Sequence, residues 1–214
     1  MCVLCRRARN KLQTKKEIIT LNTIVTETTE HGEIPMDVYQ KLANDRILFI
    51  CDDIGDEIAT DITATLLLKD SEDSEKKITL FINSQGGDIR NTLMIVDMMN
   101  IIDSPIETVC IGAAMDEAAL ILASGTKEMR FATKNSRISV GQLVNDWMAR
   151  ANLTDAKKYL DLAMSDNKRM MEIFAKSSGK SLKQVMDDFD RRVFLSAPQA
   201  AKYGFIDKVV NISK

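Results

Sequence analysis

Short apolar runs alternate with longer amphipathic stretches through the first half of this chain. Three runs of strand length cover residues 47–54, 77–84 and 106–112. Such runs are typical of strands that are covered on both faces of a parallel sheet. Between them, residues 56–73 and 88–102 carry apolar positions at helical spacing. Strands that alternate with helices predict an α/β fold.

The second half of the chain predicts a long helix and a capped C-terminal region. Residues 153–178 form one amphipathic stretch, which Gly179 ends as a C-cap. Ser196 is the expected N-cap of a later helix, because Pro198 falls in its first turn. The remaining expected elements are a weak strand at 21–27, a turn at 30–35, a helix at 36–45, a strand–turn–strand at 129–144, a capped helix at 181–190, and a helix ended by Gly204 before a final strand.

The composition is that of an ordinary globular protein, with 214 residues, 45% hydrophobic and 28% charged. We expect a flexible basic arm at residues 1–19 and a single domain at 20–214. The arm is partly similar to an organelle transit peptide, but it is short and contains no Ser. A net charge of -2 gives no reason to expect nucleic acid as a partner. No apolar run reaches the roughly 18 residues of a membrane span.

The four cysteines and the single histidine suggest no metal or redox centre. Cys51 and Cys110 lie in apolar runs, which predicts buried, reduced thiols. Cys2 and Cys5 have the spacing of a metal-binding pair, but no second pair or nearby His accompanies them. His31 lies in a predicted turn and is expected to be exposed. We therefore expect no metal and no cofactor.

Gly86 and Gly87 directly follow the apolar run that ends at Ser84-Gln85. One interpretation is a tight turn that needs positive φ angles. The other is a loop whose backbone N–H groups bind an oxyanion. The pair lacks the spacing of a dinucleotide-binding loop and the Lys of a P-loop.

A second turn, from Gly112 to Ala118, joins a strand directly to a helix. Small residues flank Asp116 there, and this layout is typical of an elbow that exposes a nucleophile. Asp116 and Glu117 also have a simpler explanation, as acidic residues at the start of a helix. With an acid at the tip of the elbow, the chain has the pattern of a serine hydrolase without its nucleophile.

Several segments together resemble ClpP, the proteolytic subunit of the ATP-dependent Clp protease. The resemblance runs from about Thr20 to Val210, and its order and spacing hold throughout. It rests on DVYQKLANDRILFI, ITLFINSQGGDI, VDMMNII, TVCIGAA, ILASGTKEMRFATKNSRI, SGKSL and FLSAPQAAKYGFIDKVV. It implies the ClpP/crotonase fold, with repeated ββα units and a protruding handle at about 142–180, made of the long helix and the segment before it.

The departures from the family pattern fall on its catalytic triad. Asp116 stands where the family has the Ser of A-S-M-G, Gly141 where it has the His of I-H-Q-P, and Arg192 where it has the Asp. Serine attack needs a base within hydrogen-bonding reach and a group that orients that base. The resemblance therefore implies a ClpR-like, triad-less homologue. Asp116 and Arg192 have the charges to form an ion pair instead.

The resemblance also assigns roles to residues outside the triad. The family's oxyanion donors correspond to the N–H groups of Gly87 and Glu117. Ring–ring contacts correspond to Asp190 and Arg191, and the pocket for the ATPase loop corresponds to Thr79, Phe81 and Ile101.

We therefore expect a non-catalytic subunit of a Clp protease core. Its expected partners are copies of itself or active ClpP subunits in seven-membered rings, and a Clp AAA+ ATPase. The expected compartment is the bacterial cytoplasm or a plastid-type stroma. Two alternatives remain, a Clp peptidase with residual or unusual activity and a crotonase-like acyl-CoA enzyme, since that related fold shares the oxyanion geometry.

Overall fold

The computed structural model describes residues 24–29, 32–143 and 152–210, which fall into one unit up to Lys41 and another from Leu42 onward. The first unit contains an antiparallel hairpin of β1 (Ile24–Thr29) and β2 (Gly32–Asp37), followed by the start of α2 (Val38–Asn44). The turn expected at 30–35 is wrong from Gly32 onward, because these residues pair with β1. The basic arm, Cys2, Cys5 and His31 lie outside the described residues.

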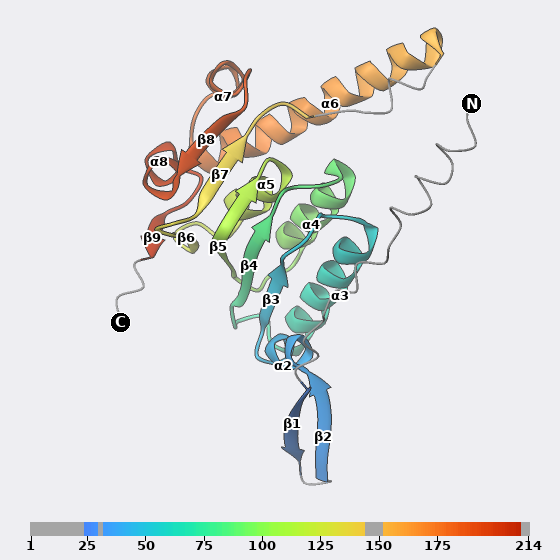
Figure 1. The fold of residues 1–214 in the computed structure, drawn as a ribbon, viewed down its shortest axis with the longest axis vertical. Coiled ribbons are helices and arrows are strands. Elements are labelled where there is room, and N and C mark those ends of the chain that lie inside the picture. Colours follow the sequence, from blue (N-terminus) through green and yellow to red (C-terminus); the bar gives the residue numbers. More distant parts are fainter. Residues whose placement is uncertain (1–23, 30–31, 144–151, 211–214) are drawn as a thin grey trace, which may run out of the picture. The chain divides into compact units, whose positions relative to one another are not determined.

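The second unit is built on a mostly parallel sheet (Figure 1). Five strands run in the order β3-β4-β5-β6-β9. The long β5 pairs first with β6 and then, nearer its end, with β7, which pairs antiparallel with β8. The bounds are β3 (Ile47–Ile50), β4 (Ile78–Ser84), β5 (Ile106–Met115), β6 (Arg130–Thr133), β7 (Arg137–Val140), β8 (Val193–Ser196) and β9 (Lys208–Val210).

Helices pack on this sheet and bury its apolar side chains. Their bounds are α3 (Asp56–Glu72), α4 (Ile89–Ile101), α5 (Glu117–Ala123), α6 (Leu153–Ser178), α7 (Leu182–Asp188) and α8 (Ala197–Tyr203). Ile78, Leu80 and Ile82 of β4 are fully buried. The small residues of α5 let that helix pack closely between β5 and α6. The predicted α/β architecture with a parallel sheet is confirmed.

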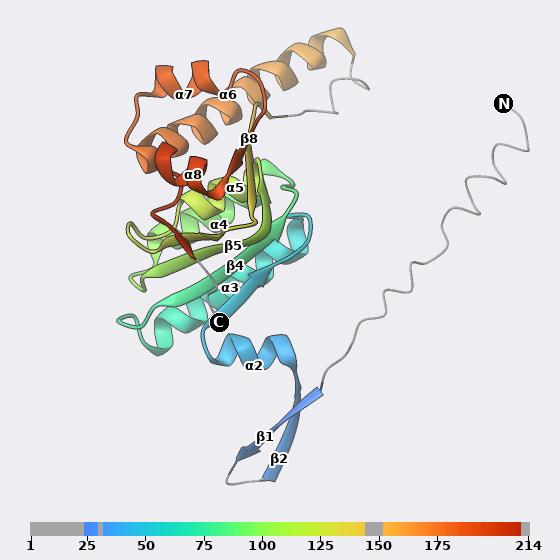
Figure 2. The ribbon, with the colours of Figure 1, turned by 60° about the vertical axis from the view of Figure 1, so that its left-hand side comes forward.

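Helix α6 matches the long helix predicted at 153–178 at both ends. Asn152 caps its first turn, and Gly179 ends it with a φ of 71° in the left-handed region. Its first half extends away from the sheet (Figure 1), and Leu153 there is 94% exposed. Its second half is anchored, because Met170, Met171 and Phe174 are buried. Figure 2 shows α7 beside α6, and α8 beside β8.

One buried ion pair ties the C-terminal segment to the sheet. The Arg130 guanidinium donates to both carboxylate oxygens of Asp207, at 2.9 and 2.6 Å. It also donates to the carbonyl oxygens of Ala123 and Ser177. Arg130 thereby joins β6, α5, α6 and the chain entering β9.

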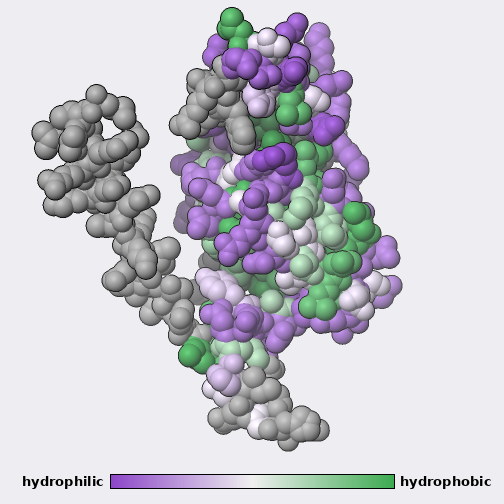
Figure 3. All heavy atoms as spheres, turned by 90° about the vertical axis from the view of Figure 1, so that its right-hand side faces the viewer, coloured by the Kyte–Doolittle hydropathy of each residue, from purple (hydrophilic) through white to green (hydrophobic). Residues whose placement is uncertain are grey.

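The surface of the molecule mixes hydrophilic residues with exposed apolar ones (Figure 3). The most exposed large apolar side chains on α3 and α4 are those of Leu67, Leu68 and Ile101. Of the helices in the described ranges, none is long and apolar enough to cross a membrane.

The two cysteines in the described residues differ in exposure. Cys110 is buried as predicted, but the prediction that Cys51 is buried is wrong. Cys51 is exposed because β3 ends one residue before it.

Candidate functional site

The strand-to-helix junction is a strained elbow centred on Asp116. Strand β5 ends at Met115 and α5 begins at Glu117, which leaves Asp116 with a φ of 46° and a ψ of −101°. A non-glycine residue in this region costs about 1–3 kcal/mol, so surrounding bonds must hold it. The Asp116 N–H donates to the Ser139 carbonyl at 2.8 Å, and the Asp116 carbonyl accepts from the Leu120 N–H at 3.2 Å.

The Asp116 carboxylate forms an ion pair with Arg192. Its Oδ2 lies 2.8 Å from Arg192 Nη2, and its Oδ1 accepts a hydrogen bond from Ser139 Oγ at 3.2 Å. Burial raises the pKa of Asp116, while Arg192 and the Ser139 hydroxyl oppose that shift. Asp116 is only 8% exposed, so the expectation of an exposed side chain at the elbow is wrong. The carboxylate points inward because its partners lie on β7 and beside β8.

Gly141 lies against Arg192 at the adjacent ends of β7 and β8. A Cβ at position 141 would lie 3.0 Å from Arg192 Cβ and 3.1 Å from its Cα. These distances are shorter than ordinary van der Waals contact, so the absence of a side chain makes room for Arg192. The structure thus brings together Asp116, Gly141 and Arg192, the three residues that the sequence resemblance assigned to triad positions.

The Gly86-Gly87 loop lies beside the elbow, and most of its backbone groups are bonded within the fold. The Gly86 N–H donates to Ser84 Oγ at 3.1 Å, and the Gly86 carbonyl accepts from the Ile54 N–H at 2.9 Å. A Cβ on Gly87 would come within 2.5 Å of the Ile54 nitrogen. Gly87, with a φ of 157°, must therefore remain glycine.

The Gly87 N–H is directed at the elbow and meets the side chain of Glu117. It donates to Glu117 Oε2 at 3.3 Å. Burial raises the pKa of Glu117, while hydrogen bonds from its own N–H and from Gly87 lower it. One of the two N–H groups predicted to be oxyanion donors, that of Gly87, therefore already has an acceptor, the carboxylate of Glu117.

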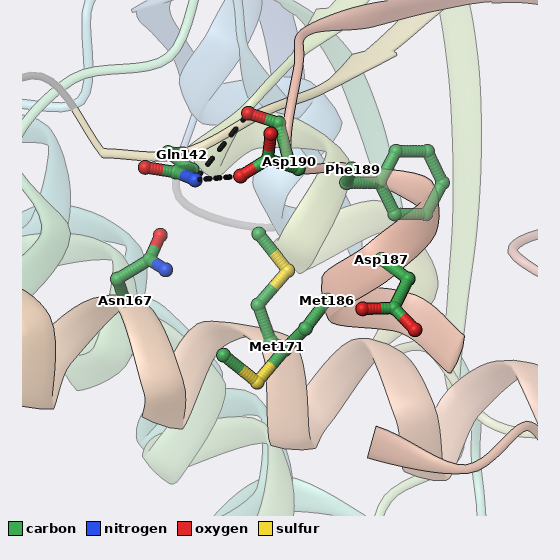
Figure 4. Close-up of a pocket in the computed structure, with 7 residues that line it drawn as sticks. All are labelled: Gln142, Asn167, Met171, Met186, Asp187, Phe189 and Asp190. Atoms are coloured by element: carbon green, nitrogen blue, oxygen red, sulfur yellow. Dashed lines mark hydrogen bonds between the residues drawn. The ribbon is translucent and has the colours of Figure 1, made fainter. Parts of the chain in front are cut away.

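A cavity of about 410 Å³ lies near the ends of β7 and β8, lined in part by Gln142 and Asp190 (Figure 4). Gln142 Nε2 donates to Asp190 Oδ1 at 2.9 Å across its rim. The other lining residues are Asn167, Met171, Met186, Asp187 and Phe189, from α6, α7 and the residue that follows α7. Gln142 and Asp190 are close neighbours of Gly141 and Arg192 in the sequence, so this cavity flanks the ion pair.

The sequence model of the Clp protease family matches residues 30–213. The chain belongs to the Clp protease family. The match covers the elbow, the glycine loop, α6, and residues Asp116, Gly141 and Arg192. The parallel sheet and its helices agree with the fold of this family.

The other residues assigned from the Clp family lie in three places. Asp190 and Arg191 are neighbours after α7, with Arg191 Nε 3.8 Å from Asp190 Oδ2. Thr79 and Phe81 lie on one face of β4, where Phe81 stacks on Phe49 with ring centroids 5.2 Å apart. Ile101 ends α4 and is 70% exposed. In residues 24–29, 32–143 and 152–210, no group of three or more His, Cys, Asp or Glu side chains is placed to hold a metal ion.

Sequence reasoning missed Ser139, which contacts Asp116 through both its backbone carbonyl and its hydroxyl. Ser139 lies opposite Met115 in the parallel pairing of β5 with β7. Only that register places it beside the elbow, and the sequence around Ser139 gives no signal of it.

Proposed function

We propose that this protein is a non-catalytic, ClpR-type subunit of a Clp protease core. One observation carries the proposal. At the nucleophile position of this Clp family member, the Asp116 carboxylate is ion-paired with Arg192, the residue at the third triad position.

This arrangement lacks the three groups that acyl transfer by a serine hydrolase requires. Such catalysis needs a hydroxyl, a base to take its proton and an acid to orient that base. Asp116 has no hydroxyl, and its two oxygens accept from Arg192 and Ser139. Gly141 has no side chain to act as a base, and Arg192 supplies a cation where an imidazolium would need an anion. Tight binding of a peptide at such a site would bring no turnover.

The role we propose instead is to build the proteolytic chamber. Family membership supports association in seven-membered rings with copies of this chain or with active ClpP subunits. The exposed first half of α6 supports it as well, because Leu153, Leu160 and Leu162 present apolar surface there. We assign ring–ring contacts to Asp190 and Arg191, and docking of a Clp AAA+ ATPase to Thr79, Phe81 and Ile101.

Restoring the triad in steps tests the catalytic part of the proposal. Asp116→Ser alone should neither cleave fluorogenic peptides nor react with a fluorophosphonate, since triad members act as a unit. Restoring activity needs at least Asp116→Ser together with Gly141→His and Arg192→Asp. Gly141→His also requires the backbone at 192 to shift by a few tenths of an ångström. A probe-reactive, peptide-cleaving Asp116→Ser protein would contradict the assignment of Gly141 to the histidine position.

Native mass spectrometry tests the structural part of the proposal. The protein, alone or mixed with an active ClpP from the same cell, should give particles built on seven subunits per ring. Co-purification from that cell should identify the partner. A monomeric mass under both conditions would refute the proposed role in the chamber.

A further inference from the structure

We propose that the Glu117 side chain is an internal ligand of the Gly86-Gly87 loop and blocks the oxyanion donors from substrate. The blocking role rests on the proposed function, because it assumes that these N–H groups correspond to the oxyanion donors of the Clp family. The contact itself can be measured without any assay of activity.

The contact is specific because the loop leaves one N–H for it. The Gly86 N–H is bonded to Ser84 Oγ, and the Asp88 N–H donates to the Ile54 carbonyl at 3.0 Å. The Gly87 N–H between them donates to Glu117 Oε2. A charged acceptor strengthens such a bond, even at the long distance of 3.3 Å.

The space for this carboxylate exists because position 86 is glycine. A Cβ on Gly86 would lie 2.5 Å from Glu117 Oε2 and 3.1 Å from the Met115 carbonyl oxygen. The carboxylate therefore lies directly over the Gly86 Cα. The backbone nitrogen of Glu117, the second predicted donor, lies 3.6 Å from the same Cβ position, so the carboxylate and both predicted donors meet over Gly86.

The consequence is a second block, independent of the missing triad. A substrate carbonyl could use the Gly87 and Glu117 N–H groups only after displacing a charged acceptor that is covalently tethered beside them. A neutral carbonyl is the weaker acceptor of the two, because hydrogen bonds to charged groups are stronger. At neutral pH the loop therefore stays closed to peptide carbonyls, and restoring the triad alone leaves the donors occupied.

Nuclear magnetic resonance of the full chain can observe this contact directly. Gly86-Gly87 is the only Gly-Gly pair among the nine glycines of the chain. In protein labelled with ¹³C-carbonyl, ¹⁵N-glycine, the Gly87 amide is therefore the only one that follows a ¹³C-labelled glycine carbonyl. A carbonyl-filtered amide spectrum isolates its signal without further assignment.

We expect the Gly87 amide proton to move upfield as the pH falls, because protonation of Glu117 removes a charged acceptor. The midpoint should lie above 4.5, the ordinary pKa of Glu, because burial raises the pKa of Glu117. The charged groups that face Glu117 are Arg192 and Asp116, and burial raises the pKa of Asp116 as well. Asp88, the next residue after Gly87, has a lowered pKa and would move the signal only at more acidic pH.

Two variants decide between these sources. In Glu117→Gln the inflection above pH 4.5 should vanish, while in the control variant Asp116→Asn it should persist. An inflection that survives in Glu117→Gln, or a wild-type signal that does not titrate, would overturn the proposal. If Glu117→Gln fails to fold, Asp116→Asn remains decisive, because an inflection that vanishes in Asp116→Asn would assign it to Asp116 and overturn the proposal. If the protein hydrolyses peptides yet shows this titration, the proposed function is refuted. The contact between the Gly87 N–H and Glu117 is then still supported.

Discussion

Removing the cation of the Asp116–Arg192 pair should destabilise the protein more than removing the anion. Asp116 is nearly enclosed, with 11% of its side chain exposed, whereas 46% of the Arg192 side chain is exposed. Arg192→Gln therefore leaves a buried carboxylate without its counter-charge. Asp116→Asn leaves a guanidinium that water can solvate, and the new amide oxygen still accepts from Ser139.

The expected magnitude lies between those of surface and buried ion pairs. Breaking a fully buried pair costs about 3–5 kcal/mol, whereas exposed pairs contribute about 0–1 kcal/mol. Because solvent reaches half of Arg192, we expect Arg192→Gln to lower the free energy of unfolding by about 1–2 kcal/mol. Asp116→Asn should cost less than about 0.5 kcal/mol, and the double variant should reveal a coupling energy of about 1 kcal/mol.

Urea unfolding of the four proteins at pH 7.5 measures these differences. One protein concentration must be used throughout, since association shifts the midpoint. Arg137→Gln is the matched control, because Arg137 is an exposed arginine on the neighbouring β7. Equal costs for the Arg137 and Arg192 variants, with no coupling to Asp116, would refute the reasoning.

The loss of stability in Arg192→Gln should also depend on pH. The folded-state pKa of Asp116 is raised, so its contribution to stability is greatest at low pH and is lost as the pH rises through that pKa. Arg192 opposes this shift, so its removal raises the pKa of Asp116 further. The cost of Arg192→Gln should therefore fade as the pH falls and Asp116 becomes protonated. A cost that stays constant down to pH 4 would contradict the assignment to this carboxylate.

Three further predictions concern the surrounding fold. In the native protein, Cys51→Ser should remove one thiol that reacts with Ellman's reagent, because Cys51 is exposed. Cys110→Ser should remove none, because Cys110 is buried and burial raises its pKa to about 11. Equal losses of reactive thiol in the two variants would contradict this. Asp207→Asn should lower the free energy of unfolding by about 3 kcal/mol, because Arg130 stays buried without its counter-charge; a cost under about 1 kcal/mol would refute it. Phe174→Ala should cost about 3–5 kcal/mol in urea unfolding, because the side chain is fully buried at the base of α6; a cost no larger than that of an exposed position on α6 would count against this packing.

Much of the fold followed from periodicity and caps. The helix at 153–178 was predicted at both ends, because Gly179 adopts the left-handed conformation that its position requires. Strand β8 was missed, since its four residues gain strand conformation only by pairing with β7. The hairpin strand from Gly32 was predicted as a turn for a similar reason, because local Gly and Pro signals compete with pairing to β1.

The candidate site was predictable in part. The resemblance placed Asp116, Gly141 and Arg192 at related positions, and opposite charges suggested the ion pair that the structure contains. Sequence could not show that the Glu117 side chain turns back onto Gly87, since this depends on the space above Gly86. Nor could it identify Ser139, whose role depends on the register between two strands.

Peptide turnover by the purified wild-type protein tests the central claim most directly. The protein should hydrolyse fluorogenic peptides no faster than a mock purification, because it offers neither a nucleophile nor a base. The matched control variant is Asp116→Asn, which removes the charge of the residue at the nucleophile position. The account predicts equal background rates for both proteins. Steady turnover that survives repurification and disappears in Asp116→Asn would contradict it.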